Sequence, residues 1–213
     1  MTGIVSSWDA TDATLRLWRR EGATWRAVGA AWPAALGHTG AAWGRGLHGD
    51  GAPSGRSGPT KKEGDGRSPA GAFALTGLYG YAAAGRGALP YTPVDEGWRC
   101  VDDPASKHYD RIVDERTVAV DWASSEEMRR RDELYRWVVT VAHNPAHAPG
   151  AGSCVFLHVW RRAGGATAGC TAMARPAIER LLDALDPADR PAYVLLPAAE
   201  YDALALTWDL PPR

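Results

Sequence analysis

The chain has 213 residues, of which 45% are hydrophobic and 23% charged, and its formal net charge is −1 at pH 7. This length can bury a sizeable core in one large domain or two small ones. The near-zero net charge argues against a nucleic-acid partner, and no apolar run approaches the ~20 residues of a membrane helix. We therefore expect a globular protein with no nucleic-acid partner and no membrane insertion.

The N-terminal segment has the pattern of a β-hairpin. Residues 14–20 alternate, with Leu15 and Leu17 on one face, and Glu21-Gly22 provides a turn into residues 24–30. Alternation on both sides of a turn is the hairpin signal. We expect this hairpin to form an annex within the same domain as the rest of the chain.

The annex is predicted over residues 1–35 and the main domain over 36–213. Residues 37–71 follow the annex and are rich in Gly, Pro and Ser, with little periodicity. A loop of this length is often functional, although a plain surface linker would have the same composition.

Most of the remaining periodic segments predict strands, and a few predict helices. Helices are expected at 124–137, where a serine precedes acidic residues, and at 173–187, with a shorter one at 198–206. The helix at 173–187 has Ile178, Leu181, Leu182 and Leu185 at helical spacing before Pro187. Strands are expected at 70–82, 98–103, 116–122, 137–144, 153–160 and 192–197. The pattern indicates a mainly β domain with two or three peripheral helices.

The cysteines and tryptophans limit the chemistry. Cys100, Cys154 and Cys170 permit one disulfide with one free thiol, or three free thiols. No two cysteines have C-x-x-C spacing and the histidines are scattered, so no metal site is expected. Ten tryptophans are unusual, and we expect most of them in core or half-buried packing, although tryptophan also lines carbohydrate and peptide grooves.

Residues 158–173, "HVWRRAGGATAGCTAM", contain the pair on which the functional interpretation depends. His158 ends an apolar strand, and a glycine-rich loop leads to Cys170, so the two side chains could meet. Cys170 also precedes the helix expected at 173–187, whose start would favour a thiolate and supply N–H groups to an oxyanion. The alternatives are a small buried cysteine, or half of a disulfide, with an unrelated histidine.

Two ordered motifs resemble the L,D-transpeptidase catalytic domain, also called the YkuD family. "FLHVWRRAGGATAGCTAM" is similar to the family signature, in which a histidine near a strand end precedes a Ser/Thr-x-Gly-Cys segment. "KKEGDGRSPAGAFAL" (61–75) resembles the family's second hallmark, a glycine-rich loop leading into a strand. "CVDDPASKHYDRIVD" (100–114) and "VAHNP" (141–145) resemble the branch found in Gram-negative envelopes. The similarity extends from about residue 37 to 200.

The resemblance implies an L,D-transpeptidase-like β-sandwich that acts as a monomer on peptidoglycan stem peptides in cell wall biogenesis. Cys170, within the segment that includes Gly169, would attack the amide after a diamino acid and release a terminal D-amino acid. His158 would accept the thiol proton, and an amine of a second stem would complete the cross-link. No metal or organic cofactor is implied.

The substrate-binding residues follow less directly from the resemblance. Arg161 is a candidate for binding a substrate carboxylate, although a solvent-facing role is also open, and Arg175 is a weaker candidate. The other candidates are Trp160, Thr167, Asn144 and Tyr81. Asn144 or the strand near 152–153 could also orient His158. The chain departs from the usual motif at Ala168, where the family has a second histidine.

The resemblance places the protein in the periplasm or cell envelope, but the N-terminal residues lack the features of a secretory signal. Hydrolysis of the same bond by an L,D-carboxypeptidase, a non-catalytic peptidoglycan-binding module and a cytosolic cysteine hydrolase remain alternatives. If Cys170 is the nucleophile, Cys100 and Cys154 are left as a disulfide pair suited to an oxidising compartment, or as two reduced thiols.

Overall fold

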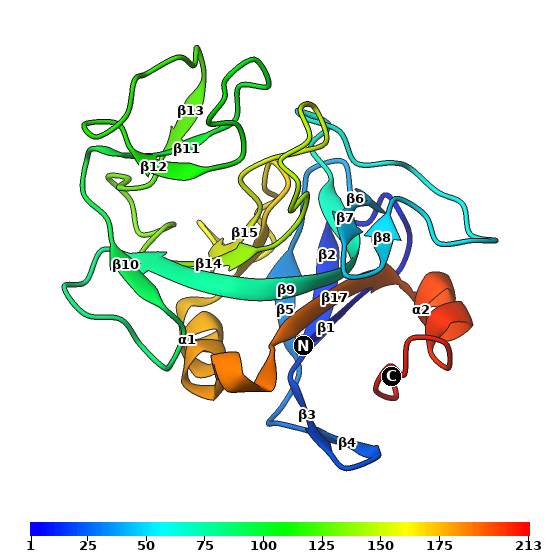
Figure 1. Ribbon diagram of the computed structural model, residues 1–213. Coiled ribbons are helices and arrows are strands. Elements are labelled where there is room, and N and C mark those ends of the chain that lie inside the picture. The colour runs from blue at the N-terminus through cyan, green and yellow to red at the C-terminus, as the bar shows by residue number, and fades with distance from the viewer.

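The computed structural model describes all 213 residues and is mainly β, with strands that form one large sheet and three small ones. Eight strands of the large sheet form a ring, because the last of them pairs back with the first (Figure 1). In ring order these strands are β9 (Ser68–Gly80), β14 (Trp137–Val141), β15 (Phe156–Val159), β16 (Thr171–Met173), β5 (Trp32–Ala35), β2 (Asp12–Arg16), β1 (Thr2–Val5) and β17 (Ala192–Pro197).

The long strand β9 closes the ring because it has two different partners along its length. Its first half pairs with β17 from Gly71 to Ala74, and its second half pairs with β14 from Leu75 to Gly80. Gly71 has a φ of 135°, and a Cβ there would lie 2.1 Å from the His48 ring, so only glycine fits. A cluster of 25 buried apolar residues fills the space that these strands and the first helix enclose.

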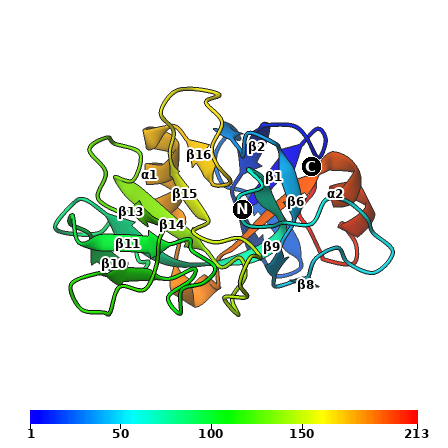
Figure 2. The same ribbon diagram turned by 90° about the horizontal axis from the view of Figure 1, so that it is seen from above.

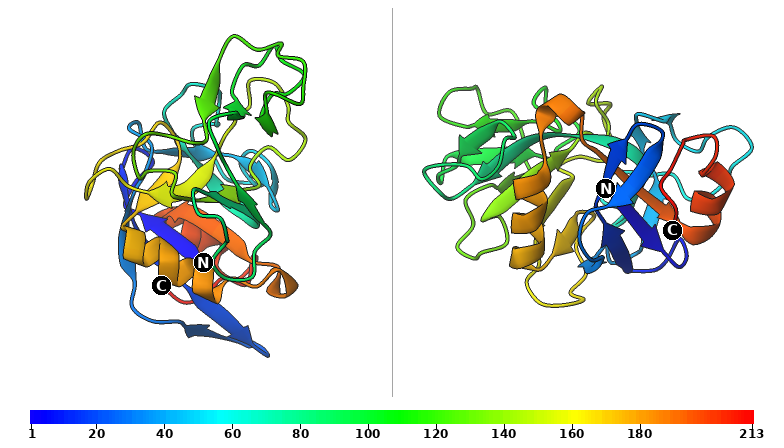
Figure 3. Two further views of the ribbon diagram at one scale, coloured as in Figure 1. Left: turned by 90° about the vertical axis from the view of Figure 1, so that its left-hand side faces the viewer. Right: turned by 90° about the horizontal axis from the view of Figure 1, so that it is seen from below.

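Two helices lie on different sides of the ring (Figure 3). α1 (Arg175–Ala184) buries Ile178, Leu181 and Leu182 in the main core, and a 3-10 turn (Pro187–Asp189) follows it. α2 (Ala198–Leu204) packs on β1 and β17. Neither helix combines the length and the apolar character that a membrane crossing would require.

Six short strands lie at the margins of the ring, two of them paired with β9 and four forming two separate hairpins. The hairpin of β3 (Trp18–Glu21) and β4 (Thr24–Ala27) projects from the end of the molecule opposite the small three-stranded sheet (Figures 1 and 3). The short strands are β3 (Trp18–Glu21), β4 (Thr24–Ala27), β6 (Ala41–Trp43), β7 (Arg45–Gly46), β8 (Gly49–Asp50) and β10 (Tyr91–Pro93).

The small three-stranded sheet stands beside β14 and β15 and is linked covalently to the ring (Figure 2). It consists of β11 (Trp98–Val101) between β12 (Ile112–Asp114) and β13 (Ser125–Glu127). A disulfide joins Cys100 of β11 to Cys154, two residues before β15. Of the two alternatives for these cysteines, a disulfide or two reduced thiols, the structure contains the disulfide.

The mainly β class is confirmed, as are the hairpin turn after Glu21 and the helices at the two C-terminal positions. The expected strands at 70–82, 98–103, 137–144, 153–160 and 192–197 all contain strands. The strands are hydrogen-bonded continuously around the ring. The expected β-sandwich arrangement stays a prediction. The domain boundary after residue 35 also stays a prediction, although β1, β2 and β5 belong to the ring.

Two predicted elements are wrong, each because a non-local or side-chain interaction overrides the local pattern. Within the helix expected at 124–137, Ser125–Glu127 pairs with β11 as β13, and the Asp132 side chain accepts a hydrogen bond from the Leu134 N–H in a turn. The strand expected at 116–122 is absent, because Asp114 folds the chain into a turn by accepting from the Arg116 N–H. The loop expected at 37–71 also contains β6, β7 and β8.

The tryptophans follow the packing expectation. None is fully exposed, and three of them, Trp32, Trp43 and Trp137, are buried. Trp8 packs edge-on against Trp43 with ring centroids 5.3 Å apart. The unusual tryptophan content is therefore used mainly in packing.

The disulfide is expected to stabilise the fold because it closes a loop between residues 54 positions apart. Replacing both Cys100 and Cys154 with serine should lower the free energy of unfolding by about 2–4 kcal/mol in urea denaturation. Cys170→Ser, which leaves the bridge intact, is the matched control. A double variant as stable as the unmodified chain would contradict a structural role for the bridge.

Candidate active site

The pairing of β15 with β16 brings His158 and Cys170 to the same face of the sheet. The two strands run parallel, with Leu157 opposite Thr171 and His158 opposite Ala172. Side chains alternate along a strand, so Phe156, His158, Cys170 and Ala172 project from one face. His158 and Cys170 both line one pocket of about 540 Å³. The two residues of the predicted pair therefore line one pocket from the same face of the sheet.

The helix expected at 173–187 is present, but the prediction that its start lies beside Cys170 is wrong. Thr171–Met173 continues from the cysteine as β16, and α1 begins at Arg175, so the helix terminus is separated from the sulfur by a whole strand. The residues after the cysteine pair with β15 and β5, and these sheet contacts delay the start of the helix from residue 173 to residue 175. No helix N-terminus is available to stabilise a thiolate at Cys170.

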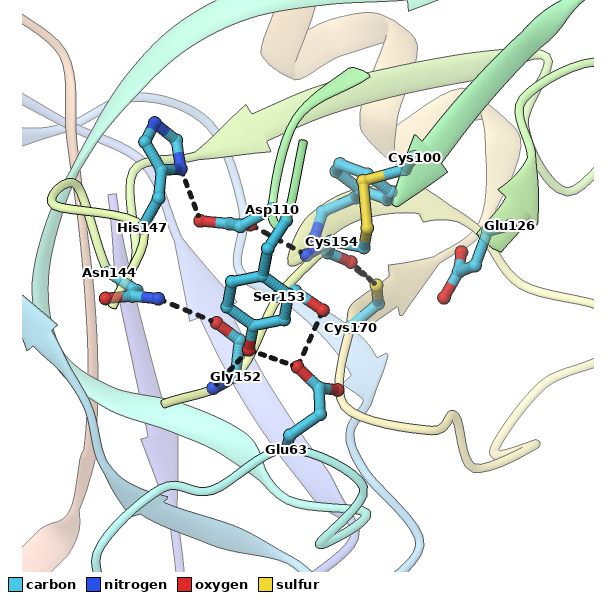
Figure 4. Close-up of a disulfide and its surroundings, with 12 residues drawn as sticks. Glu63, Cys100, Asp110, Glu126, Asn144, His147, Gly152, Ser153, Cys154 and Cys170 are labelled. Carbon is cyan, nitrogen blue, oxygen red and sulfur yellow. Dashed lines mark hydrogen bonds and ion pairs between the residues drawn. A yellow bond between two sulfur atoms is a disulfide. The ribbon is translucent and has the colours of Figure 1, made fainter. Parts of the chain in front are cut away.

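The Cys170 thiol is held in its neutral form by its surroundings (Figure 4). Its Sγ donates a hydrogen bond to the Cys154 carbonyl at 3.3 Å and accepts one from the Phe156 N–H at 3.3 Å. Burial raises the pKa of the thiol above its usual value, and the nearby Glu126 carboxylate raises it further. A nucleophilic Cys170 would therefore need a base to take its proton during the reaction.

His158 has the protonation state of such a base. Burial lowers its pKa to about 4, so the ring is neutral at pH 7. Its Nδ1 lies 2.8 Å from the Val159 carbonyl oxygen, which can only accept, so Nδ1 bears the proton and Nε2 is the free acceptor. The Tyr135 ring packs against the imidazole in a T-shaped arrangement, with the ring centroids 5.3 Å apart. A backbone carbonyl and an aromatic ring together fix the imidazole.

Two hydroxyl groups fix the backbone at Cys170. The Cys170 carbonyl accepts hydrogen bonds from Ser68 Oγ at 3.1 Å and from Thr167 Oγ1 at 2.6 Å, and the Gly169 N–H donates to Thr167 Oγ1. Gly169 has a φ of 154°, which favours glycine. The Cys170 N–H has no partner within the chain and is available to an oxyanion.

The second sequence motif supports this backbone from the opposite side. Lys61 is buried and its Nζ lies 2.6 Å from an Asp65 oxygen, and the Asp65 carboxylate also accepts from the Lys62 and Arg67 N–H groups. These contacts fold residues 61–67 into a compact loop that leads directly to Ser68. The glycine-rich motif thus positions the hydroxyl that binds the Cys170 carbonyl.

Three of the predicted substrate-binding residues lie on the pocket wall. Trp160 and Arg161 line it together with Thr167, from the loop between β15 and β16. Arg161 is mostly exposed and lies 3.6 Å from the Asp132 carboxylate. Arg130, Tyr135 and Glu126 also line the pocket, and the sequence did not predict these three residues as part of the site. They lie in the segment whose periodicity predicted a helix, and no local signal identified them.

Asn144 and Tyr81 lie outside the pocket. The Asn144 amide donates to the Ala148 and Gly152 carbonyls, so it organises its own loop and does not orient His158. The Tyr81 hydroxyl accepts from the Arg130 N–H at 3.2 Å, and therefore supports a pocket residue from behind.

Arg175, the weaker candidate for binding a carboxylate, is ion-paired with Glu179 at 2.8 Å. A second cavity of about 570 Å³ lies beside the β3–β4 hairpin and contains none of the predicted site residues.

The family model of the L,D-transpeptidase catalytic domain (YkuD) matches residues 8–194. The chain belongs to this family. No curated protein and no solved structure matches the chain. Membership indicates a peptidoglycan-acting function of the L,D-transpeptidase type.

This member departs from the usual family motif at Ala168, and a histidine from another part of the chain lies near the same segment. The His38 ring Nδ1 lies 3.1 Å from the Thr167 carbonyl oxygen, and the His38 N–H donates to the same oxygen. His38 does not line the pocket, so it does not replace the missing side chain there.

Iodoacetamide should modify Cys170 alone, because the other two cysteines are bridged. The rate should still be rising at pH 9, since the pKa of this thiol lies above its usual value of 9.0. Mass spectrometry across a pH series measures the adduct, and Cys170→Ala is the control. A rate that reaches its plateau below pH 8 would show an activated thiolate and contradict the neutral pair.

Proposed function

We propose that the protein is a cysteine-dependent L,D-transpeptidase that cross-links peptidoglycan stem peptides in the periplasm of a Gram-negative envelope. The observation that supports this most directly is the common pocket of His158 and Cys170, in which a neutral imidazole with a free Nε2 faces the same space as a neutral thiol. Family membership supplies the substrate class. The disulfide agrees with an oxidising compartment.

In the first half-reaction, Cys170 Sγ attacks the carbonyl carbon of the amide that follows the diamino acid, and His158 Nε2 takes the thiol proton. The Cys170 N–H stabilises the negative oxygen of the tetrahedral intermediate, a contribution that is roughly 2.7–4 kcal/mol for one such donor. The C–N bond then breaks, the proton on His158 passes to the leaving amine, and the D-amino acid departs. The product is a thioester at Cys170.

In the second half-reaction, an amine of another stem peptide attacks the thioester carbonyl. His158 Nε2 takes a proton from this amine and returns it to the sulfur as the C–S bond breaks, which restores the thiol. Arg161, on the exposed rim, would bind a substrate carboxylate, and Trp160 and Thr167 would form the adjacent wall of the binding site. Water in place of the amine would make the same site an L,D-carboxypeptidase.

Purified disaccharide-tetrapeptide is the direct test of this function. The protein should release D-alanine and form a cross-linked dimer, and Cys170→Ala should form neither product because no thioester is possible. His158→Gln should lower the rate by about 10²–10⁴-fold. Mass spectrometry of the digest measures transfer, while a tripeptide without dimer would indicate hydrolysis. Binding without turnover by the unmodified protein would identify a non-catalytic module.

The acid limb of the pH–activity profile should lie at a much lower pH than it would if the catalytic base had the usual pKa of a histidine. His158 must be unprotonated to act as base, and its pKa of about 4 keeps it so at every pH above about 5. In Glu126→Gln, where this pocket carboxylate does not titrate, we expect kcat/KM for D-alanine release to fall only as the pH drops through 5 towards 4. A limb centred near 6.5 would show that His158 is solvated in the working enzyme.

A further inference from the structure

Glu126 is a pocket residue that the proposed mechanism does not use. It lines the same cavity as His158 and Cys170, yet it comes from β13 in the small sheet. Its carboxylate accepts a hydrogen bond from the Tyr135 hydroxyl at 2.5 Å, and no Lys, Arg or His nitrogen lies within ion-pair distance of it. A half-buried carboxylate without a cation is costly, so its place beside a nucleophile calls for a physical reason.

The disulfide between Cys100 and Cys154 holds Glu126 near the sulfur of Cys170. Glu126 is the direct cross-strand partner of Cys100, and side chains at such positions lie on the same face of the sheet. Cys100 is bonded to Cys154, whose carbonyl accepts the hydrogen bond from Cys170 Sγ. Figure 4 shows Glu126 beside Cys170, next to the bridge. A continuous set of contacts therefore fixes the carboxylate relative to the reacting atom.

The charge of Glu126 opposes catalysis unless something neutralises it. A carboxylate near Cys170 disfavours negative charge on the sulfur, and burial makes the carboxylate itself harder to ionise. The other charged groups that act on Glu126 are Arg130, which favours its ionised form, and Asp102 and Glu63, which oppose it. Lys61 acts on the sulfur from the opposite loop, but it is already paired with Asp65. Arg130 is itself hydrogen-bonded to Asp132, so no cation of the chain forms an ion pair with Glu126.

The rest of the pocket wall has the opposite charge. Arg130, Arg161 and Arg162 line it, and Arg161 and Arg162 are exposed on the rim. Arg130 is held by two hydrogen bonds to Asp132. The pocket thus offers one inner anion beside the sulfur and an outer cationic rim, which suits a ligand that has both an ammonium and a carboxylate group.

We propose that Glu126 determines specificity by binding the free side-chain ammonium of the diamino residue whose carbonyl Cys170 attacks. This inference rests on the proposed function, because it assigns a role at the same site. The substrate cation would neutralise the carboxylate at the moment when charge develops on the sulfur and oxygen. Stem peptides with a free amine at this residue would be substrates, and those with a blocked amine would be rejected.

The test compares two tetrapeptide donors, one with the side-chain amine free and one with it acetylated. The unmodified protein should release D-alanine from the free-amine donor with a kcat/KM at least about tenfold higher, the effect of a charge-assisted hydrogen bond. Glu126→Gln keeps the shape and should reduce this ratio to within about threefold. Glu127→Gln, at the exposed neighbouring position, is the matched control and should keep the ratio. An unchanged ratio in a folded Glu126→Gln protein overturns the inference.

A second measurement separates this inference from the proposed function. Calorimetric binding of the same two peptides to Cys170→Ala requires no turnover, and the free-amine peptide should bind at least about tenfold more tightly. Adding Glu126→Gln, or Glu126→Ala if the glutamine variant is unstable, should remove the difference. If the unmodified protein shows no turnover but this difference appears, the transpeptidase assignment fails and the Glu126 assignment stands. Equal binding of the two peptides, or no binding of either, overturns the Glu126 assignment.

Discussion

The parallel pairing of β15 with β16 is the constraint on which the site depends. Because Leu157 lies opposite Thr171, the side chains of His158 and Cys170 project from one face and share one pocket. A shift of one residue in this register would turn one of the two side chains into the core. The contacts of Ser68 and Thr167 with the Cys170 carbonyl secure the register at the point where β16 begins.

The electrostatics of the pocket favour a neutral pair over a preformed ion pair. Burial moves the pKa of His158 down and that of Cys170 up, so both groups are uncharged before substrate arrives. In such a site the proton transfer and the attack must be coupled, and the substrate itself contributes to the charge balance. A site of this kind is protected from adventitious alkylation and oxidation, which require the thiolate.

The sequence predicted the parts of the structure that depend on local pattern. The spacing of Ile178, Leu181 and Leu182 predicted α1, and the order of His158, a glycine-rich loop and Cys170 predicted the pair. The position of Glu126 depends on its pairing with Cys100, which lies 26 positions earlier in the chain, and local periodicity cannot report such an interaction. The same non-local pairing explains why the segment around Glu126 is a strand despite its helical pattern. The sequence likewise left the pairing of Cys100 with Cys154 open.

The closure of the ring by β17 has a consequence for how the chain reaches its native state. β17 pairs with β1 on one side and with β9 on the other, so residues 192–197 join the first strand to the longest one. During synthesis on the ribosome, β1 and β9 would emerge with unsatisfied edges long before their shared partner is available. The ring is therefore completed late in synthesis and by contacts between distant parts of the chain. A nascent or truncated chain without β17 would be prone to aggregation.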